Sequence, residues 1–242
     1  MDLTLTPLDV AADRDELASF LSANRFPFHA VERLTRAQAE ARIDRGDYAA
    51  PDNEAFWITT RPDDRVGLIV FQEVADGGPM IDLRLSEAHR GRGIGTAALR
   101  EGTNAIFERH PEILRIEGNT RIDNVAMRKT FEAAGYVKEA HYRDGWTTAN
   151  EPPLDAVAYA ILRRDWVSGV TTPVVWGSDA PSGAASLQRL TSSADSNHLD
   201  RTYITSSYQC CPFSSTRKET SVHRPNERNL SAVTSRQPRS ST

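Results

Sequence analysis

A basic, glycine-rich segment has the residue types and spacing that would hold a diphosphate group. Its sequence is His89-Arg90-Gly91-Arg92-Gly93-Ile94-Gly95-Thr96, and it separates a predicted strand from a predicted helix. Glycines allow close approach of the backbone, so that consecutive N–H groups face one anion at the positive end of the helix. Arg90 and Arg92 add two positive charges. We therefore expect residues 90–96 to bind a diphosphate.

One interpretation of this segment is a dinucleotide-binding turn. Residues 93–98 fit the G-x-G-x-x-A pattern, and Glu117 lies near the end of the next predicted strand. Two features disfavour this interpretation. Residues 86–92 separate the strand from the first glycine of the pattern, and the preceding strands form an antiparallel meander instead of repeated βαβ units. A dinucleotide-binding domain is kept as a remote alternative.

The elements that must position this segment are predicted from hydrophobic periodicity and capping signals. Apolar residues predict strands at 3–8, 56–60, 66–71, 80–85, 113–117, 136–143 and 156–162. Helices are predicted to begin near residues 13, 35, 93 and 124, with Thr35 and Gln38 forming a capping box. The order β-α-α-β-β-β-α-β-α-β-β predicts an α/β (α+β) fold, in which a mixed sheet has helices on its faces.

Composition divides the 242 residues into a globular part and a tail. Residues 167–242 are rich in Ser and Thr and poor in Leu, Ile, Val and Phe, so they bury too little apolar surface to offset the entropy of ordering. We predict a folded domain at 1–166 and a disordered tail at 167–242. The formal net charge is −4, and the acidic excess lies in 1–166, which disfavours nucleic-acid binding.

Several other classes of site are disfavoured by the sequence. The N-terminal residues contain no basic and apolar leader, and no stretch is long and apolar enough to cross a bilayer, so we expect a cytoplasmic protein without membrane contact. The six histidines lack metal-binding spacing, and Cys210 and Cys211 are adjacent, so no metal site is expected. No G-x-S-x-G nucleophile motif is present.

The residues that follow the predicted strand at 80–85 resemble the GNAT N-acetyltransferases. Residues 90–95 match the family's Q/R-x-x-G-x-G/A signature, and Asn124 with Ala133-Ala134-Gly135-Tyr136 resembles its later N…G-F segment. The wider pattern is most similar to the ribosomal-protein N-terminal acetyltransferase branch. The resemblance covers residues 1–166. It implies a mostly antiparallel central sheet flanked by helices, with acetyl-CoA as the acetyl-donor cosubstrate.

The resemblance also implies how the donor would bind. Residues 90–96 would contact its pyrophosphate, the Leu85 N–H would meet the thioester carbonyl, and Asn124 would hydrogen-bond the cofactor arm. A fixed N–H at Leu85 suits direct attack by an amine, because the attack creates an oxyanion on that carbonyl. A helix N-cap is the alternative role of Asn124.

The sequence offers fewer candidates for proton transfer and for the acceptor site than for donor binding. Phe131 occupies the position at which many family members have a tyrosine acid, and phenylalanine has no proton to donate. Asp82 and Glu117 are the carboxylates predicted to act as base, and an ordinary solvated or ion-paired carboxylate is the alternative for each. Phe28 and His29 lie between the first two predicted helices and are expected to line the acceptor site or to pack there.

Together these residues predict an enzyme that transfers an acetyl group from acetyl-CoA to a primary amine by direct attack. The acceptor is a small molecule or a protein that the sequence does not specify, and a monomer or a homodimer is expected. The alternative is a non-catalytic module that senses acyl-CoA. It is suggested by Phe131 and by the lack of a decisive base.

Overall fold

The computed structural model describes residues 2–60, 64–147 and 152–176. All of them belong to the first of the two units into which the chain divides, Met1–Pro212. Most of the segment predicted to be a disordered tail, residues 177–242, lies outside the described residues, as do Cys210 and Cys211.

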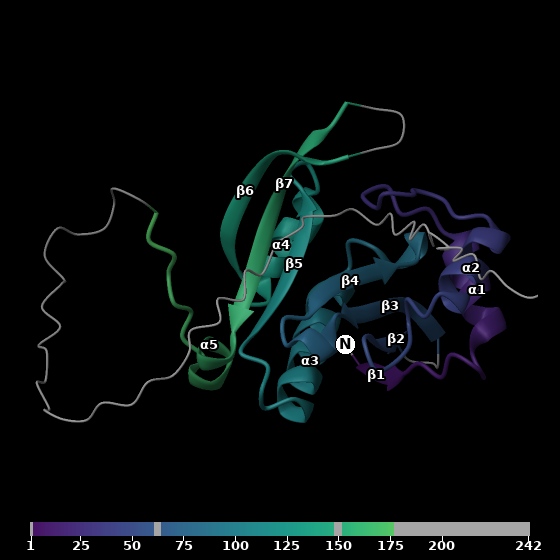
Figure 1. Cartoon of the computed structure of the whole chain (residues 1–242), viewed down its shortest axis with the longest axis horizontal. Coiled ribbons are helices and arrows are strands. Elements are labelled where there is room, and N and C mark those ends of the chain that lie inside the picture. Colours follow the sequence, from purple (N-terminus) through teal and green to yellow (C-terminus); the bar gives the residue numbers. More distant parts are fainter. Residues whose placement is uncertain (1, 61–63, 148–151, 177–242) are drawn as a thin grey trace, which may run out of the picture. The chain divides into compact units, whose positions relative to one another are not determined.

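The elements follow the predicted order, with one short helix added after the last strand (Figure 1). In chain order they are β1 (Leu3–Pro7), α1 (Arg14–Ala23), α2 (Arg36–Asp44), β2 (Glu54–Thr60), β3 (Asp64–Gln72), the 3-10 turn η1 (Val74–Asp76), β4 (Met80–Leu85), the 3-10 turn η2 (Glu87–His89), α3 (Ile94–Arg109), β5 (Arg115–Arg121), α4 (Val125–Ala133), β6 (Val137–Trp146), β7 (Leu154–Leu162) and α5 (Arg163–Ser168). The sequence pattern does not predict α5, because a helix of 6 residues is too short to show a period.

Within the described residues the strands form a seven-stranded sheet in the order β1-β2-β3-β4-β5-β7-β6. Neighbouring strands are antiparallel except β4 and β5, which are parallel. The predicted fold class, a mixed and mostly antiparallel sheet flanked by helices, is therefore confirmed.

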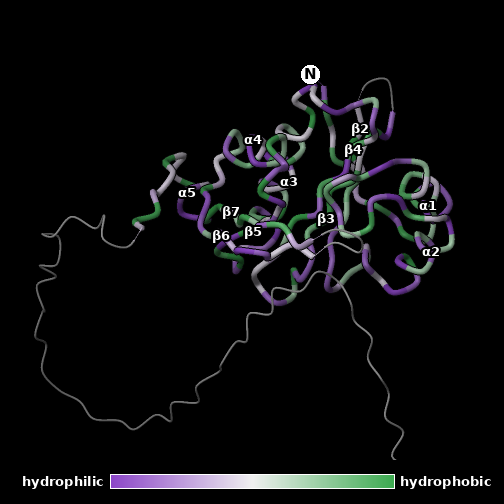
Figure 2. Tube along the Cα trace, turned by 90° about the horizontal axis from the view of Figure 1, so that it is seen from above, coloured by the Kyte–Doolittle hydropathy of each residue, from purple (hydrophilic) through white to green (hydrophobic). Residues whose placement is uncertain are grey.

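Two hydrophobic clusters cover the two faces of the sheet. One cluster joins Ile69 of β3 to Ile106 of α3 and Phe131 of α4. The other joins Leu68 of β3 to Leu17 of α1 and includes residues of α2. Neighbouring residues of β3 thus face opposite layers, as the pleat of a strand requires. In Figure 2, β3 lies between α3 and the pair α1 and α2.

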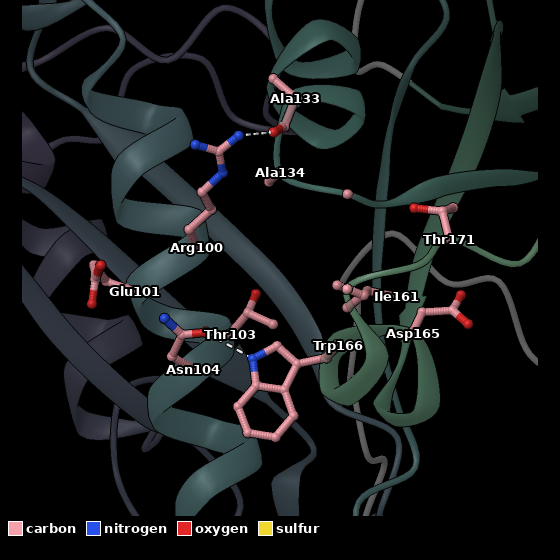
Figure 3. Close-up of a pocket in the computed structure, with 12 residues that line it drawn as sticks. Arg100, Glu101, Thr103, Asn104, Ala133, Ala134, Ile161, Asp165, Trp166 and Thr171 are labelled. Carbon is pink, nitrogen blue, oxygen red and sulfur yellow. Dashed lines mark hydrogen bonds between the residues drawn. The ribbon is translucent and has the colours of Figure 1, made fainter.

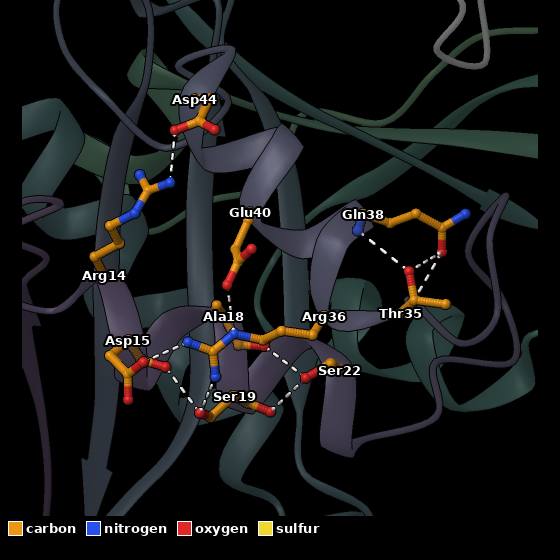
Figure 4. Close-up of polar contacts among 10 residues, drawn as sticks. All are labelled: Arg14, Asp15, Ala18, Ser19, Ser22, Thr35, Arg36, Gln38, Glu40 and Asp44. Atoms are coloured by element: carbon orange, nitrogen blue, oxygen red, sulfur yellow. Dashed lines mark hydrogen bonds and ion pairs between the residues drawn. The ribbon is translucent and has the colours of Figure 1, made fainter.

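Polar contacts join α1 to α2 (Figure 4). The predicted capping box is present, since the Thr35 hydroxyl accepts from the Gln38 N–H and the Gln38 side chain accepts from the Thr35 N–H. In the first turn of α2, Arg36 pairs with Asp15 of α1 and donates to the Ser19 hydroxyl at 2.9 Å. These contacts hold the two helices that flank the connecting segment 24–34.

Gly118 in β5 makes room for Phe131 of α4. A Cβ built on Gly118 lies 2.3 Å from the Phe131 ring, which is buried and stacks on Tyr159 at 5.1 Å. We expect Gly118→Ala to lower the free energy of unfolding by about 1–3 kcal/mol, the usual cost of overpacking, as measured by urea denaturation. Gly78→Ala is the control, because a Cβ there meets nothing within 4 Å. Equal effects of the two substitutions would contradict this packing.

Candidate active site

Strands β4 and β5 pair at one end only. Met80 lies opposite Glu117 in the register, and the Glu117 N–H donates to the Pro79 carbonyl at 2.9 Å. Beyond this pair the two strands diverge (Figure 1). The later residues of β4 therefore have a backbone edge that no strand of the described sheet covers.

The backbone N–H of Leu85 points toward this opening. The next residue, Ser86, donates its N–H to the Val66 carbonyl at 2.9 Å, across the ladder with β3. Since successive N–H groups of a strand point in opposite directions, the Leu85 N–H faces away from β3 and toward β5. The Leu85 carbonyl accepts from Arg90 Nε at 3.0 Å, which holds the end of the strand. The predicted donor thus lies at the uncovered edge.

Helix α3 begins without a side-chain cap. Gly93 is its N-cap residue, and its first turn contains no acidic residue, whereas α2 begins with a capping box. The N–H groups of Ile94, Gly95 and Thr96 have no acceptor within the helix. These groups lie at the positive end of a helix of 16 residues and are suited to bind an anion.

Two of the three glycines in this segment are required by backbone conformation. Gly91 and Gly93 have φ angles of 72° and 79°, in the left-handed region that other residues adopt at a cost. A Cβ built on either meets nothing within 4 Å, and one built on Gly95 makes only ordinary contacts, the nearest at 3.6 Å. Positive φ therefore accounts for Gly91 and Gly93, and the expectation that a Cβ in this segment would obstruct the approach of an anion stays a prediction.

The two arginines of the segment have different environments. Arg90 donates to the carbonyls of Leu85 and Arg25 and lies over the Phe26 ring at 5.6 Å, so its guanidinium ties the segment to the chain that follows α1. Burial lowers the pKa of Arg90 from its usual value. Arg92 is exposed. The expectation that both guanidinium groups face an anion therefore suits Arg92 better than Arg90.

Asn124 has the alternative role that the sequence left open. It is the N-cap of α4, where its Oδ1 accepts from the Met127 N–H at 3.2 Å and its Nδ2 donates to the Thr120 hydroxyl at 2.9 Å. The side chain is buried. Both of its polar atoms are thus engaged within the protein, and the geometry favours the cap over a contact with the cofactor arm.

His29 and Asp82, predicted for the acceptor site and for proton transfer, lie together. His29 Nε2 is 2.9 Å from Asp82 Oδ1, and Arg84 donates to the same carboxylate from Nη2 at 2.7 Å. Burial alone raises the pKa of Asp82, but the Arg84 charge and the His29 contact outweigh it and hold the pKa well below its usual range. Asp82 is therefore a permanent anion and a weak base.

The segment around His29 also contacts β5. Arg121, the last residue of β5, lies over the Phe28 ring at 5.4 Å and donates to the Pro27 carbonyl at 3.4 Å. Because His29 is bound to β4 and Phe28 to β5, residues 27–29 span the two strands where they diverge. Phe28 and His29 thus lie beside the opening between β4 and β5, and their role as a wall of the acceptor site stays a prediction.

Glu117 lies on the same side of the sheet as Asp82 but has other partners. Its carboxylate accepts from Arg115 Nε at 2.7 Å, and Arg115 also pairs with Glu139. The neighbouring Asn119 donates to the Met80 sulfur at 3.8 Å, and its Oδ1 is buried without a hydrogen-bond partner. The structure brings Asp82 and His29 together and leaves Glu117 in a separate ion pair.

Sequence reasoning missed Arg84, Asn119 and Arg121. The signal that would have found them is the presence of polar residues at alternate positions of two successive strands. These residues are Asp82 and Arg84 in β4, and Glu117, Asn119 and Arg121 in β5. The alternation places them all on one face of the sheet.

The position of the family tyrosine carries no hydroxyl. Phe131 is packed between the rings of Tyr159 and Tyr136. The Tyr136 hydroxyl pairs with Thr103 at 2.7 Å, and burial raises the pKa of Tyr136 above its usual value. The Tyr159 hydroxyl donates to Glu132 at 3.1 Å. Both hydroxyls are therefore engaged with other groups.

A pocket on the α3 side is separate from these residues (Figure 3). It is lined by residues of α3, the end of α4 and α5, including Arg100, Asn104 and Trp166, and Trp166 donates to Asn104 at 2.7 Å. None of the residues predicted for donor or acceptor lines it. In the described part of the chain, no cluster of three or more metal-ligating side chains occurs, and no helix is long and apolar enough to span a membrane.

Comparison with known families identifies the domain. The family described as acetyltransferase (GNAT) domain matches residues 2–137, more than half of the chain, and the chain belongs to this family. It is an acetyl-CoA-dependent N-acetyltransferase, which transfers the acetyl group of acetyl-CoA to an amine. No curated protein matches the chain.

Solved structures share the fold at low sequence identity. Spermidine N-acetyltransferase from Vibrio cholerae, in complex with CoA and spermine, is 16% identical with a TM-score of 0.59, over 68% of this chain and 98% of that chain. A dodecameric structure of the same enzyme is 15% identical with a TM-score of 0.56, over 69% of this chain and 97% of that chain. A probable acetyltransferase is 22% identical with a TM-score of 0.57, over 68% of this chain and 94% of that chain.

The left-handed conformation of Gly93 gives a first prediction for this site. Alanine at this position relaxes away from positive φ, and regaining it costs about 1–2 kcal/mol. We therefore expect Gly93→Ala to raise the Kd for acetyl-CoA about tenfold, as measured by calorimetry. Gly77→Ala is the matched control, since Gly77 has a φ of 80° and equally open surroundings outside the segment. An unchanged Kd in Gly93→Ala would show that this conformation is not needed for binding.

The engagement of Asn124 gives a second prediction. Asn124→Ala removes the cap of α4, so we expect the free energy of unfolding to fall by about 1 kcal/mol while the Kd for acetyl-CoA stays unchanged. Asn124→Asp retains the capping oxygen and is expected to restore most of the stability. A weakened Kd in Asn124→Ala with undiminished stability would instead support a cofactor contact.

Proposed function

We propose that the acetyl donor binds at the opening between β4 and β5. The observation that carries this proposal is that the uncapped start of α3 follows closely on the uncovered edge of β4 in the chain. The amides of residues 94–96 hold the pyrophosphate, and the Leu85 N–H holds the thioester carbonyl oxygen. A preorganised N–H at that point stabilises the oxyanion that forms when an amine attacks.

The acceptor amine, in this proposal, approaches on the face of the sheet that carries α1 and α2. On the other face, Ile81 is buried in the cluster beneath α3, and Gly118 lies against Phe131. On the α1 and α2 face, the side chains of Asp82 and Glu117 remain 17% and 29% exposed. Their carboxylate oxygens accept hydrogen bonds, which an ammonium or amine group supplies.

The acceptor in this proposal is a primary amine, and two kinds of compound are the first to test. The spermidine N-acetyltransferases share the fold, so a polyamine is the first compound to try. The N-terminus of a ribosomal protein, predicted from the sequence pattern, is the second. None of the solved structures named above is described as belonging to that branch. Both acceptors present a primary amine to the same face.

Other predictions from the sequence stand as parts of this proposal. They are a folded domain at 1–166 with a disordered tail at 167–242, a cytoplasmic location, and a monomer or homodimer. The Thr172 hydroxyl donates to Asp165 at 2.6 Å, so contacts of the described chain continue a few residues beyond 166.

Release of CoA from acetyl-CoA tests the proposed function across an amine panel. The panel contains spermidine, a peptide with a free N-terminus, a lysine peptide with a blocked N-terminus, and an aminoglycoside. We expect at least one amine to raise CoA release well above the rate without amine, because the site presents a donor to a neutral amine. Binding of acetyl-CoA with no acceleration by any amine would favour the alternative of a sensing module.

A further inference from the structure

The two ring nitrogens of His29 have unlike environments. Nε2 lies 2.9 Å from Asp82 Oδ1, whereas Nδ1 is buried and has no hydrogen-bond partner among the described residues. A carboxylate can only accept, so Nε2 must carry the proton, and in the neutral ring Nδ1 then has the lone pair. The contact with Asp82 thus selects the tautomer in which Nδ1, the nitrogen without a hydrogen-bond partner, can accept a proton.

Asp82 is held as an anion that serves this contact. Arg84 donates to the carboxylate from Nη2 at 2.7 Å and from Nε at 3.1 Å, and the Arg84 side chain is 3% exposed. The guanidinium also lies over the Phe26 ring at 5.0 Å. Because the buried guanidinium keeps Asp82 ionised, the carboxylate orients the imidazole and does not take its proton.

The surroundings of His29 favour the neutral ring. Burial and the charge of Arg84 lower the pKa of His29 from its usual 6.5, Arg42 of α2 acts in the same direction, and Asp82 opposes them. Tyr48, which follows α2, is buried beside the same ion pair, and burial raises its pKa, so it stays uncharged. A neutral imidazole with a free lone pair is competent as a general base.

His29 also lies where such a base is needed. It contacts β4 at Asp82, two residues past the Met80 pair and three residues before Leu85, which carries the proposed carbonyl-binding N–H. Residues 27 and 28 contact Arg121 of β5. The imidazole is thus on the face of the sheet that carries α1 and α2, next to the strand that positions the donor.

A second unpaired acceptor lies on the opposite strand. Asn119 is two residues past Glu117 in β5, as Asp82 is two residues past Met80 in β4, so the two side chains lie on the same face of the sheet, on either side of the opening. Asn119 Oδ1 is buried without a partner. Asn119 Oδ1 is thus a second acceptor without a partner on the face that carries His29.

We propose that His29 Nδ1 is the general base that accepts a proton from the acceptor amine, with Asp82 as the positioning residue. The proposal rests on the proposed function. The ammonium gives one proton to His29 and becomes a neutral amine, whose lone pair forms the C–N bond. The C–S bond breaks with its electron pair on sulfur, and the nitrogen loses its second proton to the thiolate, which leaves as the CoA thiol.

Substitution of His29 tests the proposal in the full chain. With the most active amine of the panel at saturation, we expect His29→Ala to lower kcat by about 10²-fold or more, with an unchanged Kd for acetyl-CoA and partial rescue by added imidazole. His141→Ala is the matched control. His141 also pairs with a carboxylate, Asp155 at 2.6 Å, but it lies exposed on β6, and its loss should leave kcat unchanged.

The pH profile separates a base from a structural residue. The acid limb of kcat/KM in the wild type should have its midpoint below pH 6.5, because the base works only when unprotonated and its pKa is lowered. Asp82 raises that pKa, so Asp82→Asn should move the midpoint to lower pH. The acid limb of kcat/KM should be absent in His29→Ala. This variant leaves the buried Asp82–Arg84 pair intact, so it still tests the proposal if Asp82→Asn fails to fold.

Nitrogen NMR of the imidazole gives a measurement that needs no acceptor. We expect the neutral ring at pH 7 to carry its proton on Nε2. A proton on Nδ1, a wild-type kcat in His29→Ala, or a loss confined to KM would overturn the proposal and leave His29 as a wall of the acceptor site. Failure of the wild type to bind acetyl-CoA would contradict the proposed function instead.

Discussion

The early end of the parallel pairing between β4 and β5 is the constraint on which the rest of the site depends. Backbone N–H and C=O groups need partners, and a strand inside a sheet usually finds them on both sides. Here the pairing reaches only Met80 and Glu117, so the remaining edge of β4 is left for a ligand. The parallel direction also requires a crossover, and α3 supplies it, which places the start of that helix near the end of β4.

The two faces of the diverging strands divide the chemistry. On the α3 and α4 face, apolar residues and the Gly118–Phe131 contact build a rigid support. On the α1 and α2 face, alternate positions carry the ionised and amide side chains. Because a strand alternates its side chains, one short stretch of β4 can position a backbone donor, anchor a core and orient a histidine.

The order of elements and the capping box at Thr35 were predictable, because each is local in sequence. Periodicity, turn residues and cap spacing report on neighbours within a few positions. The contact between His29 and Asp82 joins residues 53 positions apart and is a tertiary event. The cap role of Asn124 was visible as one of two possibilities, and only the geometry of Met127 and Thr120 favoured it.

Arg90 links the end of β4 to the segment that follows α1 through two main-chain carbonyls. Its guanidinium is held by the carbonyl oxygens of Leu85 and Arg25, which every residue type supplies. These two hydrogen bonds of Arg90 therefore do not depend on which side chains the segment between α1 and α2 carries. Such an arrangement lets a lineage alter which amine it accepts while the machinery for the thioester stays in place.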